Sequence, residues 1–339
     1  MAFITDYLEK ILAGEDLSLG ESQSLLDTIF DGEVDAAQVA AFLTAMRAKG
    51  ETVAEIAGLA NSLRNHAVRV ETALDDLVDT CGTGGASVKT FNISTAAAFV
   101  AAGAGCHVAK HGNRAITSNC GSADVLEALG VNITAGPEVV AECIRRAGVG
   151  FMFAPNYHPA MKYVQPVRKG LGFRTVINFL GPLANPAFAQ MQVMGVGDPG
   201  LMETVAEVLK MLGKRRAMVV HSEGLDEIST MAETRILHLN QDGSITEEIL
   251  EPESVGIAKA SIDDLKGGSA EENATVVKSI FDRTETGAKR DIVLLNAAAS
   301  IMVSSLAYNF ADAIELAKAS IDDGKAKASL EIMVEVSNG

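Results

Sequence analysis

Two glycine-rich polar segments, residues 79–95 and 110–124, constrain the fold more than any other feature of this chain. Each follows a short apolar run and precedes a helical run, so each is expected to join a strand to a helix. A backbone with few Cβ atoms leaves its N–H groups accessible, and the helix start that follows adds a favourable dipole for phosphate. The second segment also carries Lys110 and Arg114. Together the segments predict a site for a multiply phosphorylated, sugar-like ligand.

The bulk composition limits the class of protein. The 339 residues are 48% hydrophobic and carry a net charge of −16. We expect a large apolar core, and neither nucleic acid nor a membrane as a partner, because both are anionic. The four cysteines show no Cys-x-x-Cys spacing, which disfavours disulfides and structural zinc and fits a reducing compartment. No apolar stretch has the length of a signal or a membrane span, so we expect a cytoplasmic protein.

The hydrophobic periodicity changes along the chain. Three-to-four spacing predicts helices at 7–12, 22–30, 36–48 and 56–63, the last opened by a capping box from Thr52 to Glu55. From residue 77 the pattern alternates between the two element types. The expected strands are 77–78, 107–109, 150–153, 192–195, 216–221 and 235–239, and the expected helices between them include 94–104, 123–129, 137–147 and 199–212. The tail, 291–336, is expected to be helical.

This alternation predicts an α/β protein, with a small all-helical domain plus a large α/β domain with a mostly parallel central sheet flanked by helices. We expect residues 1–72, completed by about 160–190, to form the helical domain, and 73–159 with 191–339 to form the large phosphate-binding domain. Ligands of such sheets bind beyond the carboxyl ends of the strands. Both glycine-rich segments are expected at that edge.

The first glycine-rich segment matches no common nucleotide motif. A Gly-x-Gly-x-x-Gly fingerprint would need glycine at Ser87, and the chain has no Walker loop. We expect Asn92 or Ser94 to cap the following helix, leaving the other hydroxyls facing a ligand. Lys110, Asn113 and Arg114 lie among glycines and serines of an acidic chain, which favours ligand contact over an ordinary basic patch.

Three further side chains are ambiguous from the residues alone. The adjacent carboxylates Asp226 and Glu227 follow a glycine and by themselves favour a surface turn. Magnesium, however, is commonly held by one or two carboxylates together with substrate phosphate oxygens. Arg168 could end an exposed helix, or could place its planar fork on the carboxylate of an aromatic acid.

Several blocks in order resemble the anthranilate phosphoribosyltransferase family. The signature loops are matched by 81–97 and 110–130, and the similarity continues through 158–162, 167–169, 181–186 and 224–229. The resemblance implies a small helical domain, a large α/β domain and a homodimer formed through the helices. It implies transfer of the 5-phosphoribosyl group from 5-phosphoribosyl 1-diphosphate to the amine of anthranilate, a step of tryptophan biosynthesis that yields N-(5-phosphoribosyl)anthranilate and diphosphate. Mg²⁺, with two ions per monomer, is the implied cofactor.

The resemblance also assigns site residues. Phosphoribosyl diphosphate is expected to contact Gly82, Gly85, Ala86, Thr90, Asn92, Ile93, Ser94, Thr95, Lys110, His111, Gly112, Asn113, Arg114, Ala115, Ile116, Thr117, Ser118 and Ser122. Anthranilate is expected at Gly82, Asn113 and Arg168, and magnesium at Ser94, Asp226 and Glu227. We expect no covalent nucleophile, because the departing diphosphate can be stabilised by magnesium and by the main-chain N–H groups of 84–86 and 92–95.

Two positions depart from the family pattern, and three competing functions stay open. Ala86 stands where many relatives carry Asp, and Asn119 where many carry Lys, so metal or diphosphate contacts could differ. Pyrimidine nucleoside phosphorylases share the fold and a similar phosphate loop. A phosphoribosyltransferase that acts on a different aromatic acid is the second competing function, and a silent paralogue that binds nucleic acid is the third.

Overall fold

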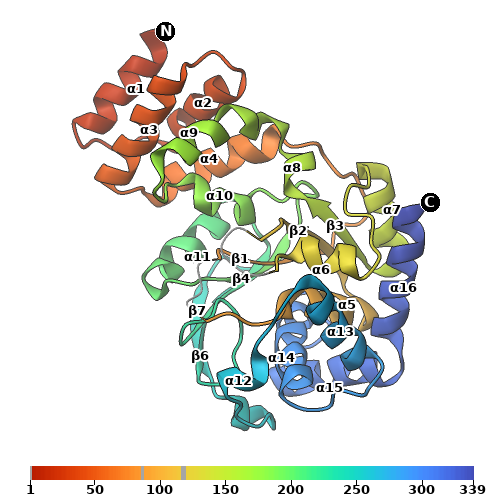
Figure 1. Ribbon diagram of the computed structural model, residues 1–339. Helices are drawn as coiled ribbons and strands as arrows, with labels where there is room; N and C mark the ends of the chain where they lie inside the picture. The colour runs from red at the N-terminus through yellow and green to blue at the C-terminus, as the bar shows by residue number, and fades with distance from the viewer. Residues whose placement is uncertain (1, 85–87, 116–119) are drawn as a thin grey trace.

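The computed structural model describes residues 2–84, 88–115 and 120–339. The first helices form a separate group at the N-terminal end, and a twisted sheet with helices packed against it makes up the rest (Figure 1). This arrangement confirms the predicted fold class of a small helical part and a larger α/β part with a mostly parallel sheet. Among the helices in the described ranges, none has the length and hydropathy that spanning a membrane would require.

The N-terminal helices are α1 (Ala2–Leu12), α2 (Leu19–Phe30), α3 (Ala36–Lys49) and α4 (Val53–Asn65). The predicted capping box of Thr52 and Glu55 is present at the start of α4. The buried Glu55 carboxylate also accepts the N–H of Leu17 at 2.9 Å and the ammonium of Lys49 at 3.0 Å. One side chain therefore starts a helix and ties it to the loop before α2.

A later segment packs against these helices. It comprises α8 (Ala154–Tyr157), the 3₁₀ helix η1 (Pro159–Tyr163), α9 (Gln165–Leu171) and α10 (Ile177–Leu183). Helix α10 lies against α4 and α9 against α3. Ala160, Val164 and Leu180 are buried in the same apolar core as α1–α4. The helix η1 has the tighter 3₁₀ form, which is common in short connectors.

The sheet has seven strands in the order β3-β2-β1-β4-β5-β6-β7. They are β1 (Leu77–Gly82), β2 (His107–Gly112), β3 (Val149–Phe153), β4 (Met191–Gly195), β5 (Arg216–Ser222), β6 (Thr234–Leu239) and β7 (Ile245–Leu250). Strands β1 to β5 are parallel, β6 pairs antiparallel with β5, and β7 pairs antiparallel with β6. The six predicted strands are all present. The sequence pattern does not predict β7, because Glu247 and Glu248 interrupt its apolar residues; charges of this kind protect an edge strand from further pairing.

Helices cover both faces of the sheet. They are α5 (Ile93–Gly103), α6 (Ser122–Ala128), α7 (Pro137–Ala147), α11 (Met202–Met211), α13 (Ala270–Phe281), α14 (Ala288–Val303), α15 (Phe310–Asp322) and α16 (Lys325–Asn338), with the short α12 (Ile262–Leu265), η2 (Pro199–Leu201) and η3 (Pro252–Val255). Helix α14 contacts β1, β4 and β5 as well as α5 and α15, and is buried on most sides. One apolar core lies on this face. On the other face, α11 shares a core with α1–α4.

The crossing of α2 and α4 depends on Gly58, and this dependence can be tested. A methyl group on Gly58 would overlap the Ser22 Oγ and the Leu19 carbonyl oxygen, so Gly58→Ala should lower the free energy of unfolding by about 1–3 kcal/mol. Gly20, in the same pair of helices, is exposed and has nothing within 4 Å of its Cβ position. Gly20→Ala should therefore be neutral or stabilise by about 0.5–1 kcal/mol. Urea unfolding of both variants would measure the difference, and equal effects would contradict the packing described here.

Candidate active site

Three neighbouring parallel strands end on glycine at one edge of the sheet: β1 at Gly82, β2 at Gly112 and β4 at Gly195. Gly82 and Gly195 are register partners. Both glycine-rich segments leave the sheet at this edge, as predicted. A turn from β5 also reaches this edge and carries Asp226 and Glu227.

Asp226 lies against the ends of β1 and β4. The turn before it is closed by two hydrogen bonds between Ser222 and Leu225, of 3.2 and 3.0 Å. The Asp226 carboxylate accepts the main-chain N–H of Gly84 at 3.0 Å. A Cβ on Gly82 would overlap this carboxylate, and a Cβ on Gly195 would overlap the Asp226 carbonyl oxygen. The two strand-ending glycines therefore make the room that Asp226 occupies.

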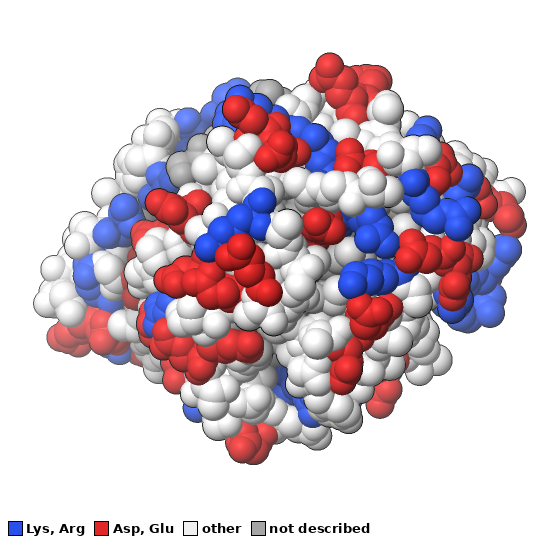
Figure 2. All heavy atoms as spheres, turned by 90° about the horizontal axis from the view of Figure 1, so that it is seen from below, with Lys and Arg blue, Asp and Glu red and all other residues white. Residues whose placement is uncertain are grey.

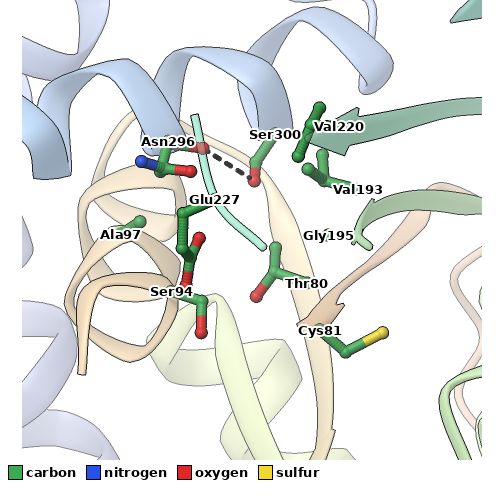
Figure 3. Close-up of a pocket in the computed structure, with 10 residues that line it drawn as sticks. All are labelled: Thr80, Cys81, Ser94, Ala97, Val193, Gly195, Val220, Glu227, Asn296 and Ser300. Atoms are coloured by element: carbon green, nitrogen blue, oxygen red, sulfur yellow. Dashed lines mark hydrogen bonds between the residues drawn. The ribbon is translucent and has the colours of Figure 1, made fainter. Parts of the chain in front are cut away.

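Glu227 lies on the other side of the turn, beside the start of α5. Ser94 lies beside the Glu227 carboxylate, where its polar groups favour the charged form of Glu227, and Figure 3 shows the two side chains next to each other. The buried Lys110 donates its ammonium to Thr80 O at 2.5 Å and to Ser94 Oγ at 3.3 Å. Strand β2 thus supplies a cation close to the carboxylate from the β5–β6 turn.

The ionisation of these groups follows from burial and from each other. Burial and the adjacent Asp226 carboxylate raise the pKa of Glu227 to about 8. Burial also raises the pKa of Asp226 and lowers the pKa of Lys110. Both carboxyl groups are therefore held in surroundings that disfavour their negative charge. A nearby cation would reverse this preference, because it stabilises the charged form.

The donor set suits magnesium. Two carboxylates and a serine hydroxyl are hard oxygen ligands, which Mg²⁺ prefers, and Mg²⁺ usually completes its shell with water and phosphate oxygens. Among the residues that the structure describes, no cluster of three or more His, Cys, Asp or Glu side chains could hold a metal by itself. The pair at Asp226 and Glu227 therefore fits an ion that a phosphorylated ligand brings with it.

The start of α5 differs from the prediction. Asn92 occupies the cap position but makes no side-chain cap hydrogen bond, and the Ser94 hydroxyl accepts the Lys110 ammonium at 3.3 Å. Instead, the Asn92 amide donates to Cys120 O at 3.2 Å and accepts from Asn273 at 2.9 Å. The predicted cap is wrong because Asn92 joins the first glycine-rich segment to the second and to α13. The N–H of Gly84, expected to face a diphosphate, is donated to the Asp226 carboxylate.

The other predicted contacts in the first segment are main-chain or buried positions. Thr90 pairs with Lys266 in an isolated β-bridge, which fixes the loop beside α12. Ile93 is buried in the core and Thr95 is 1% exposed. These residues hold the loop. Ile93 could reach a ligand only through its main chain, and Thr90 and Thr95 only through their main chains or hydroxyls.

The second segment is organised by an acidic residue that sequence reasoning missed. Asp124 accepts the N–H groups of Ala115 at 2.9 Å and Gly121 at 2.8 Å, so it folds the segment back onto the start of α6. Asn113 O accepts the hydroxyl of Ser122 at 3.3 Å. An acidic residue three positions after a glycine at a helix start is the available signal, since its carboxylate can accept the main-chain N–H of the cap residue, which is half of a capping box.

Arg114 does not project freely from this segment. Its guanidinium forms ion pairs with Asp124 at 2.9 Å and Glu127 at 2.8 Å, and it lies 5.7 Å from the centre of the Phe153 ring. Gly112 ends β2, where a side chain would overlap the Ser122 hydroxyl.

Of the predicted contacts, Gly85, Ala86, Ile116, Thr117 and Ser118 lie outside the described residues, as does the departure at Asn119.

Arg168 lies on α9, where a second cation accompanies it. Burial and the nearby Arg174 charge lower the pKa of Arg168. Its closest polar partner is Gln165 Oε1, at 3.5 Å. Within the described ranges, no carboxylate forms an ion pair with Arg168. A half-buried guanidinium beside another cation is a favourable position for an anionic group.

Cys81 is the residue before the last of β1, near the turn, but its environment opposes nucleophilic chemistry. Burial and the neighbouring Asp79 carboxylate raise the pKa of the Cys81 thiol. Its sulfur accepts the amide of Gln192 at 3.2 Å. A thiol becomes a nucleophile by losing its proton, and this site stabilises the protonated form.

Two buried histidines lie together between β2 and the segment 154–183. The His111 and His158 rings meet edge to face, with centroids 4.9 Å apart. His111 Nδ1 lies 3.1 Å from Gly181 O, which links β2 to α10. Burial lowers the pKa of His111 to about 4, and burial with the neighbouring His111 lowers the pKa of His158 to about 3.

This pair makes the protein sensitive to acid. Because both pKa values lie below the usual 6.5, the unfolded chain binds more protons than the folded chain below that pH. Stability should therefore be full above about pH 6.5 and fall as the pH decreases. His158→Phe keeps an aromatic ring but cannot be protonated, so between about pH 7 and pH 5 it should lose about 1–2 kcal/mol less than the wild type. Urea unfolding at the two pH values gives the comparison; identical losses would contradict the assignment.

Known protein families match the chain over nearly its whole length. The model described as "Glycosyl transferase family, helical bundle domain" matches residues 5–67, and "Glycosyl transferase family, a/b domain" matches 74–327. Curated relatives include the anthranilate phosphoribosyltransferase of Herpetosiphon aurantiacus, 49% identical over 99% of both chains, and that of Thermomicrobium roseum, 49% identical over 99% of this chain and 97% of the relative.

Solved structures agree with these matches. The anthranilate phosphoribosyltransferase of Thermus thermophilus is 40% identical, covers 98% of this chain and 99% of its own, and superposes with a TM-score of 0.92. The Saccharomyces cerevisiae enzyme in complex with PRPP and Mg is 28% identical, covers 99% and 98%, and has a TM-score of 0.91. Because the similarity in sequence and in fold extends over the full length, this chain belongs to the anthranilate phosphoribosyltransferase family.

Proposed function

We propose that this chain transfers the 5-phosphoribosyl group of 5-phosphoribosyl 1-diphosphate to the amine of anthranilate, releasing diphosphate, as the names of its relatives state for them. The observation that carries the proposal is the Asp226 and Glu227 turn at the ends of β1 and β4. It brings two magnesium-type ligands to the edge where both glycine-rich segments leave the sheet. The same family membership favours the transferase over a pyrimidine nucleoside phosphorylase.

The residues divide the work between binding and orientation. The diphosphate and ribose would lie between the two glycine-rich segments, against the predicted contacts of 82–95, 110–118 and Ser122. Mg²⁺ held by Ser94, Asp226 and Glu227, two ions per monomer in our proposal, would supply positive charge for the departing diphosphate. Lys110 keeps a cation beside Glu227 and Ser94.

Anthranilate would bind between the segments and α9. An aromatic amine is uncharged at neutral pH, so it needs no strong base to attack a sugar carbon. Arg168 would receive the anthranilate carboxylate, while Gly82 and Asn113 would line the path to the sugar. Positioning of this kind accounts for much of the barrier reduction in two-substrate reactions. The reaction then needs no covalent intermediate, in keeping with the protonated state favoured for the Cys81 thiol.

We also propose the domain division and setting predicted from the sequence. Residues 1–72, completed by about 160–190, would form the helical domain, and a homodimer would form through it, with the exposed Leu12 of α1 in the interface. The four free cysteines support a reducing, cytoplasmic location.

On the face seen in Figure 2, acidic and basic side chains are interspersed. A nucleic acid would need a continuous basic surface, so this face offers it no site.

The carboxylate pair provides the direct test of this function. Wild-type protein given Mg²⁺, phosphoribosyl diphosphate and anthranilate should consume anthranilate, which is followed by loss of its fluorescence; the chain contains no tryptophan to interfere. Replacing Asp226 by Asn and Glu227 by Gln should lower kcat/KM by at least about 100-fold, because developing charge loses its stabilisation. Glu223→Gln changes an exposed carboxylate of the same turn and should remain active. Full wild-type activity in excess EDTA would refute the magnesium role.

Arg168 gives a separate test of the acceptor site. Arg168→Ala should weaken anthranilate binding by about 1.5–3 kcal/mol, which raises the anthranilate KM about tenfold to a hundredfold while the diphosphate substrate is bound normally. Lys169→Ala removes the adjacent exposed cation and serves as the matched control. Steady-state kinetics with each substrate varied would separate the two effects. An unchanged anthranilate KM in Arg168→Ala would exclude this role.

A further inference from the structure

The turn that carries Asp226 and Glu227 continues past helix α14 before it joins β6. Ile228, the next residue, is fully buried, and its main chain faces the helix. A little further on, Ser229 donates its N–H to Thr234 Oγ1 at 3.0 Å, at the start of β6. The two carboxylates therefore lie on a short stretch with the strand-end glycines on one side and α14 on the other.

Asn296 of α14 holds this stretch through both main-chain groups of Ile228. Its Oδ1 accepts the Ile228 N–H at 3.0 Å, and its Nδ2 donates to the Ile228 carbonyl at 2.8 Å. The same Nδ2 donates to Ile292 O, one turn earlier in α14, at 2.9 Å. The Asn296 amide thus makes with Ile228 the two hydrogen bonds that the main chain of a neighbouring strand would make. Since the side chain is 4% exposed, water cannot substitute for it.

A small cavity beside Glu227 makes the position of this side chain depend more on the hydrogen bonds between Asn296 and Ile228. A cavity of about 10 Å³ lies between Glu227, Ser94, Thr80, Asn296 and Ser300, as Figure 3 shows. A space of this size admits about one water molecule. On this side Glu227 borders a water-sized space and no packed side chain, so the main chain that Asn296 fixes helps to determine where Glu227 lies. Ser300 lines the same cavity, but among the described residues its hydroxyl donates to Asn296 O of its own helix alone, at 3.5 Å.

We propose that Asn296 is a positioning residue for the magnesium-binding carboxylates, acting through the main chain of Ile228. The inference rests on the proposed function, in which Asp226 and Glu227 hold Mg²⁺ for phosphoribosyl diphosphate. In this role Asn296 acts through the main chain and needs no contact with metal or substrate. It fixes the main chain next to both carboxylates, and so their position relative to Gly84, whose N–H Asp226 accepts, and to Ser94, which lies beside Glu227. Groups that orient metal ligands in this way typically change metal affinity when they are lost.

The test compares three variants with the wild type. Binding of Mg²⁺ with phosphoribosyl diphosphate, without anthranilate, is measured by isothermal titration calorimetry, and KM and kcat are then determined for each substrate. Asn296→Ala should weaken this binding by about 10–100-fold and leave the anthranilate KM close to the wild-type value. Asn296→Gln keeps the amide and can extend into the cavity, so it should lose less. Ser300→Ala, the matched control on the same helix and cavity, should bind as the wild type does.

Any other outcome contradicts either the positioning role of Asn296 or the proposed function. If Asn296→Ala binds like the wild type, or if Ser300→Ala is weakened as much, the positioning role is wrong. Thermal unfolding shows whether each variant is folded; where Asn296→Ala is not, Asn296→Gln carries the test, and wild-type binding by it overturns the proposal. If neither folds, Asn296 supports the fold as a whole and the proposal also fails. Failure of the wild type to bind Mg²⁺ with phosphoribosyl diphosphate would instead refute the proposed function.

Discussion

The close approach of the Asp226 turn to the ends of β1 and β4 is the contact on which the site depends. Parallel strands normally end in side chains that fill the space above the sheet edge. Here Gly82 and Gly195 leave that space open, and the turn enters it far enough for Asp226 to accept the N–H of Gly84. Any larger residue at either strand end would displace the carboxylates from the two glycine-rich segments.

That approach brings several charged groups into poorly solvated surroundings, and neighbouring polar groups offset the cost. Glu227 lies beside Ser94 and near Lys110, which both favour its charged form, yet its pKa is still raised to about 8. Lys110 in turn donates to Thr80 and Ser94. A further cation would complete the balance, and this supports the magnesium site that we propose here. The main-chain N–H of Gly84 serves the Asp226 carboxylate.

The sequence predicts the fold class and the place of both glycine-rich segments at the strand ends, because these features depend on local patterns. The capping box at Thr52, the alternation after residue 77 and the glycine-rich segments each leave a signal within a few residues. The contacts that the sequence pattern does not predict are those between residues far apart in the chain. Local pattern predicts Asn92 as a cap of α5, but Asn92 bonds Cys120 and Asn273, and no local rule identifies partners 28 and 181 positions away. Asn296, 68 positions after Ile228, is the same kind of miss. The roles of the individual site residues stay predictions.

The apolar core shared by α11, the sheet and helices α1–α4 has a consequence for engineering. Although the ribbon suggests two lobes that could be exchanged between relatives (Figure 1), the side chains of Leu209 and Val219 lie in one continuous interior with those of Leu26 and Phe42. A chimera that joined the helices of one relative to the sheet of another would need matching side-chain volumes across that boundary, since interiors tolerate neither voids nor overlap.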